Sequence, residues 1–329
     1  MSERFTRRSF LETVATGAAV TSHAAADETS RFPTRVLGKT GARVTIVALG
    51  CGNRLQRYGD EGAMQAIHTA LDNGIGYLDT AFGYGRGASE TWVGQVMKTR
   101  RRQVFLATKI EPRNGDDATR ILEQSLKRLQ TDQIDLIHVH GLGNEDDLAK
   151  IEAKDGVLHA LYKLRDQKVY RFVGITSHSD PAVLKTALER HDFDCTQMAL
   201  NAAMQGFVSG TGGNMAPNPD LKTSFQNVAL PVAVRKNLGI IGMKVMGQDN
   251  LLQPGPAKAD PAMLFRYTLS LPVATVVLGM PTHDLIRQNA AWARAFTPLS
   301  ESQMKEFSRQ TAEKHKASID RIFADHVDA

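Results

Sequence analysis

The stretch QVFLATKIEPRNGDDATRILEQSLKRLQTDQIDLIHVH, residues 103–140, holds two short apolar runs separated by a segment of helical period. The runs QVFLATK and IDLIHVH at its two ends are short and mainly apolar, as buried strands are. Between them, Leu122, Leu126 and Leu129 recur at three- and four-residue spacing, which predicts an amphipathic helix lying against a sheet. The stretch therefore predicts a strand, a helix and a second strand.

The same alternation continues along most of the chain. Eight apolar runs follow one another from Thr45 onward, namely TIVALG (45–50), IGYLD (75–79), QVFLATK (103–109), IDLIHVH (134–140), YRFVGITS (170–177), DCTQMAL (194–200), GIIGMKV (239–245) and ATVVLG (274–279). Nearly continuous apolar strands are typical of parallel sheets that helices cover. Eight strand-then-helix units predict an α/β protein with a (β/α)8 TIM barrel. The alternative, an open doubly wound sheet, lacks its usual G-x-G-x-x-G motif before the first helix.

Two further segments complete the predicted barrel domain, residues 31–329, which ends in a C-terminal helical extension. RVLGKTGARVTI, residues 35–46, has Gly41 between two alternating runs and predicts an N-terminal β-hairpin closing the barrel floor. Residues 205–224 are rich in glycine, proline and asparagine. A loop of that length in a compact domain is usually functional or mobile.

The first thirty residues have a different composition. Arg7 and Arg8, followed by Phe10 and Leu11, resemble a twin-arginine export signal, and the alanines of 24–26 fit an A-x-A cleavage site. Residues 1–30 are therefore predicted to be an export leader, with the twin-arginine machinery as partner and the periplasm as destination. The alternative is a disordered basic N-terminus on a cytoplasmic protein.

The composition of the 329 residues limits the possible classes of protein. With 42% hydrophobic and 23% charged residues, the chain is typical of a globular protein with a sizeable core. Its net charge of +5 is too small to suggest a nucleic-acid partner. No uncharged apolar run reaches the roughly 18 residues that a membrane-spanning helix needs, so no membrane span is expected. Cys51 and Cys195 lie on predicted strands, and we expect core thiols instead of a disulfide.

Four titratable groups stand near the carboxyl ends of three neighbouring strands. The predicted strands end at Asp79, Lys109 and His140, and Tyr84 follows Asp79 on the next loop. Active sites of (β/α)8 barrels lie at this end of the strands. The sequence therefore predicts that all four groups share one mouth.

Such a set can move a proton to or from an oxygen atom. The pKa of a free tyrosine lies near 10, and a neighbouring ammonium such as Lys109 lowers it by favouring the phenolate. Asp79 would keep that ammonium charged, and His140 could donate a hydrogen bond to the oxygen held by the phenol. No metal set, flavin motif or nucleophile elbow is visible, so a bound cofactor would supply the hydride that turns a carbonyl into an alcohol.

Three motifs carry a resemblance to a known family. The chain resembles the aldo-keto reductases from about Thr34 to about Asn289, in DTAFGYGRGASE (79–90), Thr108-Lys109 and DLIHVH (135–140). This resemblance implies a barrel that binds NADP(H) or NAD(H), with NADP(H) favoured, and a small-molecule carbonyl or alcohol as substrate. It also implies Tyr84 as general acid/base, with Asp79, Lys109 and His140 tuning it.

The resemblance further implies residues that bind the cofactor. Ser177 and Gln197 would hold the nicotinamide carboxamide, with Asn201 near them, and Gln288 and Asn289 would lie beside the adenine. The remaining cofactor positions that it implies are His178, Met243, Lys244, Gly279 and Arg287.

Several of these positions depart from the family pattern. His178 stands where many members have asparagine, and Met243 stands where a tyrosine usually stacks on the nicotinamide. Gly279 and Leu285 replace a lysine and an arginine that NADP-preferring members often carry. Arg287 or His283 could replace that clamp at the start of a helix, where a phosphate is favoured; the alternative for Arg287 is a solvated helix charge.

Three other classes of protein remain open from the sequence. His138 and His140 share one face of a strand, as in a metal-dependent barrel hydrolase. Lys109 or Lys244 could form the Schiff base of an aldolase. A non-catalytic dinucleotide-binding protein would need the same cofactor residues. No metal is expected in the reductase interpretation.

Overall fold

Eight parallel strands close into a barrel in the computed structural model, which describes residues 32–209, 215–218, 221, 223–255 and 257–324. In chain order they are β3 (Val47–Gly50), β4 (Tyr77–Asp79), β5 (Phe105–Ile110), β6 (Ile134–Val139), β7 (Tyr170–Ser177), β8 (Cys195–Ala199), β11 (Gly239–Met243) and β12 (Thr275–Leu278). Pairing of β12 with β3 closes the circle. The predicted (β/α)8 barrel is confirmed. The predicted leader, residues 1–30, lies outside the described residues.

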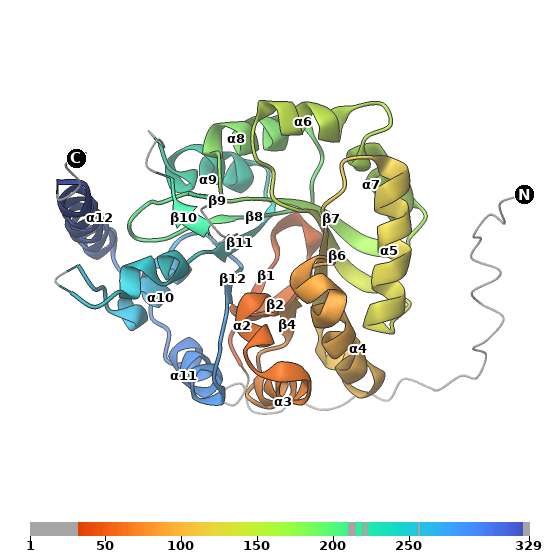
Figure 1. The fold of residues 1–329 in the computed structure, drawn as a ribbon, viewed down its shortest axis with the longest axis horizontal. Helices are drawn as coiled ribbons and strands as arrows, with labels where there is room; N and C mark the ends of the chain where they lie inside the picture. Colours follow the sequence, from red (N-terminus) through yellow and green to blue (C-terminus); the bar gives the residue numbers. More distant parts are fainter. Residues whose placement is uncertain (1–31, 210–214, 219–220, 222, 256, 325–329) are drawn as a thin grey trace, which may run out of the picture. The chain divides into compact units, whose positions relative to one another are not determined.

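Helices surround the strands (Figure 1). They are α2 (Asn53–Gln56), α3 (Gly59–Asp72), α4 (Ala88–Arg100), α5 (Gly115–Leu129), α6 (Glu145–Glu152), α7 (Val157–Asp166), α8 (Pro181–Arg190), α9 (Phe225–Arg235), α10 (Pro261–Ser270), α11 (His283–Arg294) and α12 (Glu301–Ala324). Short 3-10 turns complete the connections: η2 (Gly38–Thr40), η3 (Tyr84–Gly87), η4 (Arg101–Gln103) and η6 (Gly247–Leu252). Among the described residues, no helix is both long and apolar enough to cross a membrane.

Helix α5 shows how the sequence forms these elements. Asn114 caps its start by accepting hydrogen bonds from the backbone N–H groups of Asp116 and Asp117 at 2.9 and 3.2 Å. Leu122 and Leu129, which the helical period predicted to face the sheet, are both buried. Burying each of these leucine side chains stabilises the fold by about 1.5–3 kcal/mol.

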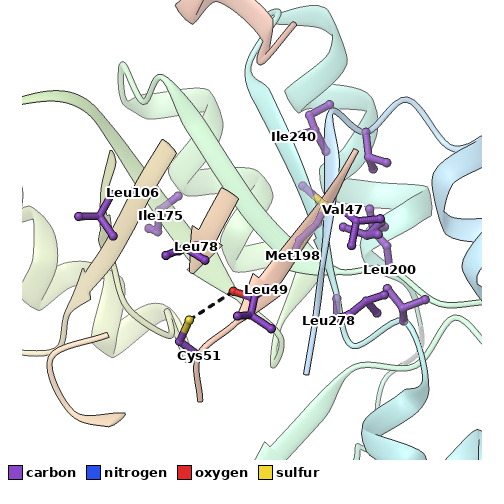
Figure 2. Packing of buried hydrophobic residues seen from close by; sticks show 14 of the residues in the cluster. Val47, Leu49, Cys51, Leu78, Leu106, Ile175, Met198, Leu200, Ile240 and Leu278 are labelled. Atoms are coloured by element: carbon purple, nitrogen blue, oxygen red, sulfur yellow. Dashed lines mark hydrogen bonds between the residues drawn. The ribbon is translucent and has the colours of Figure 1, made fainter. Parts of the chain in front are cut away.

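Strand alternation divides the core into an inner and an outer cluster. Along β5, Phe105 and Ala107 belong to the cluster inside the barrel, whereas Leu106 and Ile110 belong to the cluster between strands and helices. Lys109 continues the inward series, two residues after Ala107. Figure 2 shows part of the outer cluster, including Leu78, Leu106, Ile175, Met198 and Leu278. The alternation therefore fills the floor of the barrel with apolar side chains and brings Lys109 into its mouth.

The predicted N-terminal hairpin is confirmed. Strands β1 (Thr34–Val36) and β2 (Arg43–Thr45) pair antiparallel. Between them, Leu37 is fully buried and belongs to the inner cluster, so the hairpin closes the barrel floor. Gly38 in the turn has φ +50°, and a Cβ there would lie 2.3 Å from the carbonyl carbon of Leu238. Only glycine fits this close approach.

The segment predicted as a long loop, residues 205–224, contains a second small hairpin. Strands β9 (Phe207–Ser209) and β10 (Met215–Pro217) pair antiparallel. The backbone N–H of Phe207 donates to the carbonyl oxygen of His178 at 2.5 Å. This bond ties the segment to the end of β7. Each strand has only three residues and lies in a segment rich in glycine, proline and asparagine, so the composition indicated a loop and the sequence analysis missed the pairing.

Candidate active site

Lys109 lies at the centre of the barrel mouth, with 2% of its surface exposed. Its Nζ donates hydrogen bonds to Asp79 Oδ1 at 2.5 Å and to the carbonyl oxygen of Thr80 at 2.7 Å. The phenol of Tyr84 is its third polar neighbour. Burial alone would lower the pKa of Lys109, but Asp79 and Tyr84 more than reverse this effect and hold that pKa above its ordinary value. Lys109 is therefore an ammonium at neutral pH.

Tyr84 stands on a tight turn after β4. Gly85, Arg86 and Gly87 all have positive φ, at 58°, 54° and 95°, which bends the chain back over the mouth. The ring of Tyr84 lies beside Lys109, whose Nζ is 5.0 Å from the ring centroid. Burial raises the pKa of Tyr84, Lys109 lowers it, and the balance lies above the ordinary value of 10.0.

This balance corrects the expectation that Lys109 would bring the pKa of Tyr84 down. The ammonium acts in the predicted direction, but the loss of water around the phenol is the larger effect. Tyr84 is consequently a neutral phenol at neutral pH, a state in which it holds a transferable proton.

His140 follows β6 and faces Tyr84. The two rings meet edge to face with centroids 5.7 Å apart. Burial lowers the pKa of His140 below its ordinary value, although a hydrogen bond with Glu111 opposes this shift. The imidazole is therefore neutral at neutral pH. The structure thus brings together the four groups predicted to share the mouth.

Glu111 is a member of this site that the sequence analysis missed. Its Oε1 lies 3.0 Å from His140 Nδ1. Burial would raise the pKa of Glu111, but hydrogen bonds from His140 and from the backbone N–H of Gly83 hold that pKa below its ordinary value. Glu111 comes two residues after Lys109, so strand alternation continued past the end of β5 could have indicated it.

A second carboxylate that the sequence analysis missed packs near the turn that carries Tyr84. Glu90 in α4 is fully buried and accepts a hydrogen bond from Thr108 Oγ1 at 2.7 Å. Arg128 lies 3.5 Å from Glu90 Oε2, and its guanidinium covers the ring of Phe82 at 4.4 Å. These contacts connect α4 and α5 to the turn that carries Tyr84.

The residues predicted to hold the nicotinamide lie at the ends of β7 and β8. Gln197 is 2% exposed, and its Oε1 has no hydrogen-bond partner among the described residues. Such an atom suits an amide donor, because a buried acceptor left unpaired costs about 1–3 kcal/mol. Ser177 is also buried and donates to the carbonyl oxygen of Leu142 at 2.8 Å. The amide of Asn201 is engaged by the backbone of Gln205.

Three further predicted cofactor residues lie beside them. His178 Nδ1 is 3.0 Å from the carbonyl oxygen of Phe207, and burial lowers the pKa of His178 to about 4. Met243 is half-buried at the end of β11, and Lys244 follows it with φ 59°. Burial, and secondly the charge of Lys109, lowers the pKa of Lys244 to about 8. Within the described part of the chain Lys244 has no acidic partner, so its ammonium suits an anionic group.

The positions predicted for the adenine end are on or before α11. Asn289 is buried, and its Oδ1 has no partner among the residues that the structure describes. Gln288 is exposed. Arg287 is 59% exposed and pairs with Asp284 at 2.8 Å within its own helix. Gly279 follows β12, and a Cβ there would lie 2.5 Å from Arg54 Cγ.

Arg54 also makes an ion pair that no sequence pattern indicated. Arg54 follows β3 in the chain. Its guanidinium binds the carboxylate of Asp249 in η6, the turn after β11. Since β12 lies between β3 and β11 in the barrel, this pair bridges the end of β12. It thereby links the segments that follow β3 and β11.

The geometry gives no support to the metal-dependent alternative. His138 is fully buried deeper in the barrel than His140, and both of its ring nitrogens lack a partner among the described residues. No group of three or more His, Cys, Asp and Glu side chains in the described ranges could hold a metal ion. Cys51 and Cys195 are buried free thiols, as predicted.

The fold and the four polar groups at its mouth define a (β/α)8-barrel protein with a cluster of titratable side chains at the carboxyl ends of its strands. A model of the aldo/keto reductase family matches residues 48–261, and the chain belongs to this family.

Known relatives and solved structures agree with this assignment. The chain is 33% identical over 181 residues to the uncharacterized oxidoreductase YqkF of Bacillus subtilis, a match that covers 51% of this chain and 56% of the relative. The chain spans about half the length of several curated relatives that it matches. The holo form of the aldo-keto reductase AKR11C1 from Bacillus halodurans has the same fold, with a TM-score of 0.69 at 23% identity over 85% of this chain and 96% of that one. An aldo-keto reductase from Klebsiella pneumoniae in complex with NADPH gives a TM-score of 0.64 at 21% identity over 85% and 95%.

Proposed function

We propose that the chain is an NAD(P)(H)-dependent oxidoreductase that interconverts a small-molecule carbonyl and an alcohol, with Tyr84 as general acid/base. The observation that carries the proposal is the buried Lys109 ammonium, which Asp79 and Thr80 hold in place against the phenol of Tyr84. This arrangement stabilises a negative charge that develops on the phenol oxygen when its proton leaves.

Each residue has a separate part in the proposed reaction. Tyr84 donates its proton to the carbonyl oxygen during reduction and takes it back during oxidation. Lys109 stabilises the phenolate in between, and Asp79 keeps Lys109 charged and oriented. His140 contacts the substrate oxygen beside the phenol. A nicotinamide dinucleotide, when bound, supplies or accepts the hydride.

The cofactor would lie across the ends of β7, β8, β11 and β12. The unpaired Gln197 Oε1 supports binding of the nicotinamide carboxamide, together with Ser177. Lys244, which lacks an acidic partner in the described residues, would bind a phosphate oxygen, with His178 and Met243 beside it. The adenosine half of the dinucleotide would lie among Gly279, Arg287, Gln288 and Asn289. We favour NADP(H), which the Klebsiella relative binds.

We also propose that residues 1–30 are a twin-arginine leader and that the folded enzyme is exported to the periplasm. The paired Arg7 and Arg8 and the small residues that follow them support this proposal. The twin-arginine machinery would then be a partner of the precursor. The alternative is that the working enzyme stays in the cytoplasm.

A direct test of the activity uses the purified protein with a panel of aldehydes and ketones and with NADPH and NADH in separate reactions. We expect substrate-dependent loss of the absorbance of the reduced nicotinamide, and we expect Tyr84→Phe to abolish it. Absence of turnover with every carbonyl and both dinucleotides, in protein that binds the dinucleotide, would favour a non-catalytic binding protein.

A further inference from the structure

Residues before and after Tyr84 contact the same guanidinium, that of Arg128 in α5. Arg128 Nη1 donates to the carbonyl oxygen of Phe82 at 3.4 Å, and the guanidinium carbon lies 4.4 Å from the centroid of the Phe82 ring. A Cβ at Gly87 would lie 2.4 Å from the same carbon, so the guanidinium packs directly against this glycine. Phe82 precedes Tyr84 by two residues and Gly87 follows it by three. Arg128 therefore contacts the turn on both sides of Tyr84.

The backbone of this turn is strained and needs support from outside. Three successive residues after Tyr84, ending at Gly87, have positive φ. The middle one is Arg86, with φ 54°. Residues other than glycine rarely adopt this left-handed conformation, and they keep it only where the surrounding contacts fix the backbone. The contacts of Arg128 with the two ends of the turn are contacts of this kind.

Glu90 in turn fixes the guanidinium of Arg128. Its Oε2 lies 3.5 Å from Arg128 Nη1, and its Oε1 accepts a hydrogen bond from Thr108 Oγ1 at 2.7 Å. Thr108 precedes Lys109 in β5, and Glu90 is fully buried between the strand and the helices. Helices α4 and α5, which carry Glu90 and Arg128, lie side by side outside the barrel (Figure 1). The position of the guanidinium is therefore tied to the strand that carries Lys109.

We propose that Arg128 is a positioning residue that places the hydroxyl of Tyr84 for proton transfer, with Glu90 holding the guanidinium over the turn. The role in proton transfer rests on the proposed function, whereas the placement of Tyr84 rests on the contacts alone. A displacement of about 1 Å in a reacting group can slow a reaction about a hundredfold. Loss of Arg128 should accordingly slow the chemical step without weakening cofactor binding.

The first measurement follows the ring of Tyr84 without any need for activity. Fluorine NMR of protein labelled with 3-fluorotyrosine gives a signal for each tyrosine, and the Tyr84 signal is assigned by its loss in Tyr84→Phe. We expect Arg128→Ala to shift or split this signal. Added guanidinium ion, far below the concentrations that unfold proteins, should restore it. A Tyr84 signal in Arg128→Ala identical to that of the wild type would overturn the proposal, whatever the enzyme's activity.

The second measurement separates chemistry from binding. The single-turnover rate of 4-nitrobenzaldehyde reduction by bound NADPH should fall about ten- to a hundredfold in Arg128→Ala, with the Kd of NADPH nearly unchanged. Guanidinium ion should recover much of this rate. Methylammonium ion, which has the charge but not the planar fork, should not. A loss confined to KM or to NADPH binding would overturn the positioning role.

Failure of the proposed function has a different outcome. A wild-type protein that reduces neither this aldehyde nor any other carbonyl would reject the oxidoreductase activity, and the role of Arg128 in proton transfer with it. The fluorine spectra would still decide whether Arg128 places the ring of Tyr84, because they require no turnover.

A double variant tests the part of Glu90 and protects against misfolding. Arg128→Ala leaves Glu90 as a buried carboxylate without its cation, whereas Glu90→Gln combined with Arg128→Ala leaves no charge and keeps an acceptor for Thr108. The double variant should show the same shifted Tyr84 signal and the same slow chemical step. Guanidinium ion should not rescue it, because the carboxylate that binds this ion is gone. Equal rescue of the single and double variants would remove Glu90 from the proposal.

Arg165 provides a matched control. Its guanidinium carbon lies 4.9 Å from the centroid of the Tyr162 ring, and its Nη1 lies 3.5 Å from Asp194 Oδ2. Its side chain is 23% exposed, against 29% for Arg128. Arg165→Ala should shift the fluorine signal of Tyr162 and leave that of Tyr84 and the single-turnover rate unchanged. Effects on Tyr84 and on the rate as large as those of Arg128→Ala would show that any lost arginine of this kind causes them, and would overturn the proposal.

Discussion

The ammonium of Lys109 donates a hydrogen bond to Asp79 Oδ1 over 2.5 Å, and neither side chain is more than 3% exposed. Removing two charges from water costs several kcal/mol each, and only close geometry with further hydrogen bonds offsets this cost. Lys109 has a further hydrogen bond to the carbonyl oxygen of Thr80, and the phenol of Tyr84 lies beside it. Since an apolar pair would stabilise the fold as well or better, the ion pair is better explained by its action on Tyr84.

Removing one partner of this pair should destabilise the fold strongly. We expect Lys109→Met to lower the free energy of unfolding by about 3–5 kcal/mol, because Asp79 is left as a buried charge without its partner. The double variant Asp79→Asn with Lys109→Met should lose less than the sum of the two single variants. Urea denaturation of the four proteins measures this coupling. Strict additivity would show that the two charges do not interact.

Tyr84→Phe should abolish carbonyl reduction and leave dinucleotide binding nearly unchanged. The substitution removes the transferable proton and little else, and loss of one general acid costs about 10²- to 10⁴-fold in turnover. Single-turnover kinetics measure the chemical step, and fluorescence titration with NADPH measures binding. Reduction by the variant at the wild-type rate would remove Tyr84 from the mechanism.

His178 should make the fold less stable in mildly acidic solution. Burial lowers the pKa of His178 to about 4, whereas in the unfolded chain it stays near 6.5. Between these values the unfolded state binds a proton that the folded state does not, so stability is lost as the pH falls from about 6.5 to about 4. His178→Asn keeps a donor for Phe207 and should remove roughly 1–3 kcal/mol of that loss. Denaturation midpoints of both proteins across this range test the prediction; parallel pH curves would contradict it.

The ion pair between Arg54 and Asp249 should slow release of the dinucleotide. It bridges the end of β12, where the proposed cofactor site passes toward α11. We expect Asp249→Asn to raise the dissociation rate of NADPH several-fold, with little change in the chemical step. Stopped-flow displacement of NADPH measures that rate. Asp284→Asn, which breaks the exposed pair with Arg287, is the control and should leave the rate unchanged.

Arg7 and Arg8 provide a test of the proposed leader. Changing both to lysine keeps the positive charge but removes the paired arginines that the export machinery recognises. We expect the precursor to accumulate in the cytoplasm of a bacterium with a twin-arginine pathway. Cell fractionation with an antibody against the protein measures its location. Equal periplasmic yields of variant and wild type would reject the leader.

The sequence by itself determined the barrel and the place of four polar groups. Eight apolar runs with helical segments between them allow few other folds, because each strand must be buried on both faces and each helix on one. Asp79 ends β4, Lys109 is the last residue but one of β5, and His140 follows β6, and the carboxyl ends of parallel strands meet at one edge. The sequence alone could therefore predict that these side chains lie close together. The roles of these residues in catalysis stay a prediction.

Only the tertiary structure decided how these groups act on one another. The pKa of Tyr84 lies above its ordinary value because burial outweighs Lys109, and the extent of burial depends on the whole surrounding fold. The pairs Glu111–His140 and Arg54–Asp249 join residues 29 and 195 positions apart, a range at which no local period operates. Local periods report which face of an element is apolar. Solvent exclusion and long-range charge pairing arise only when the elements pack, so only the packed chain sets them.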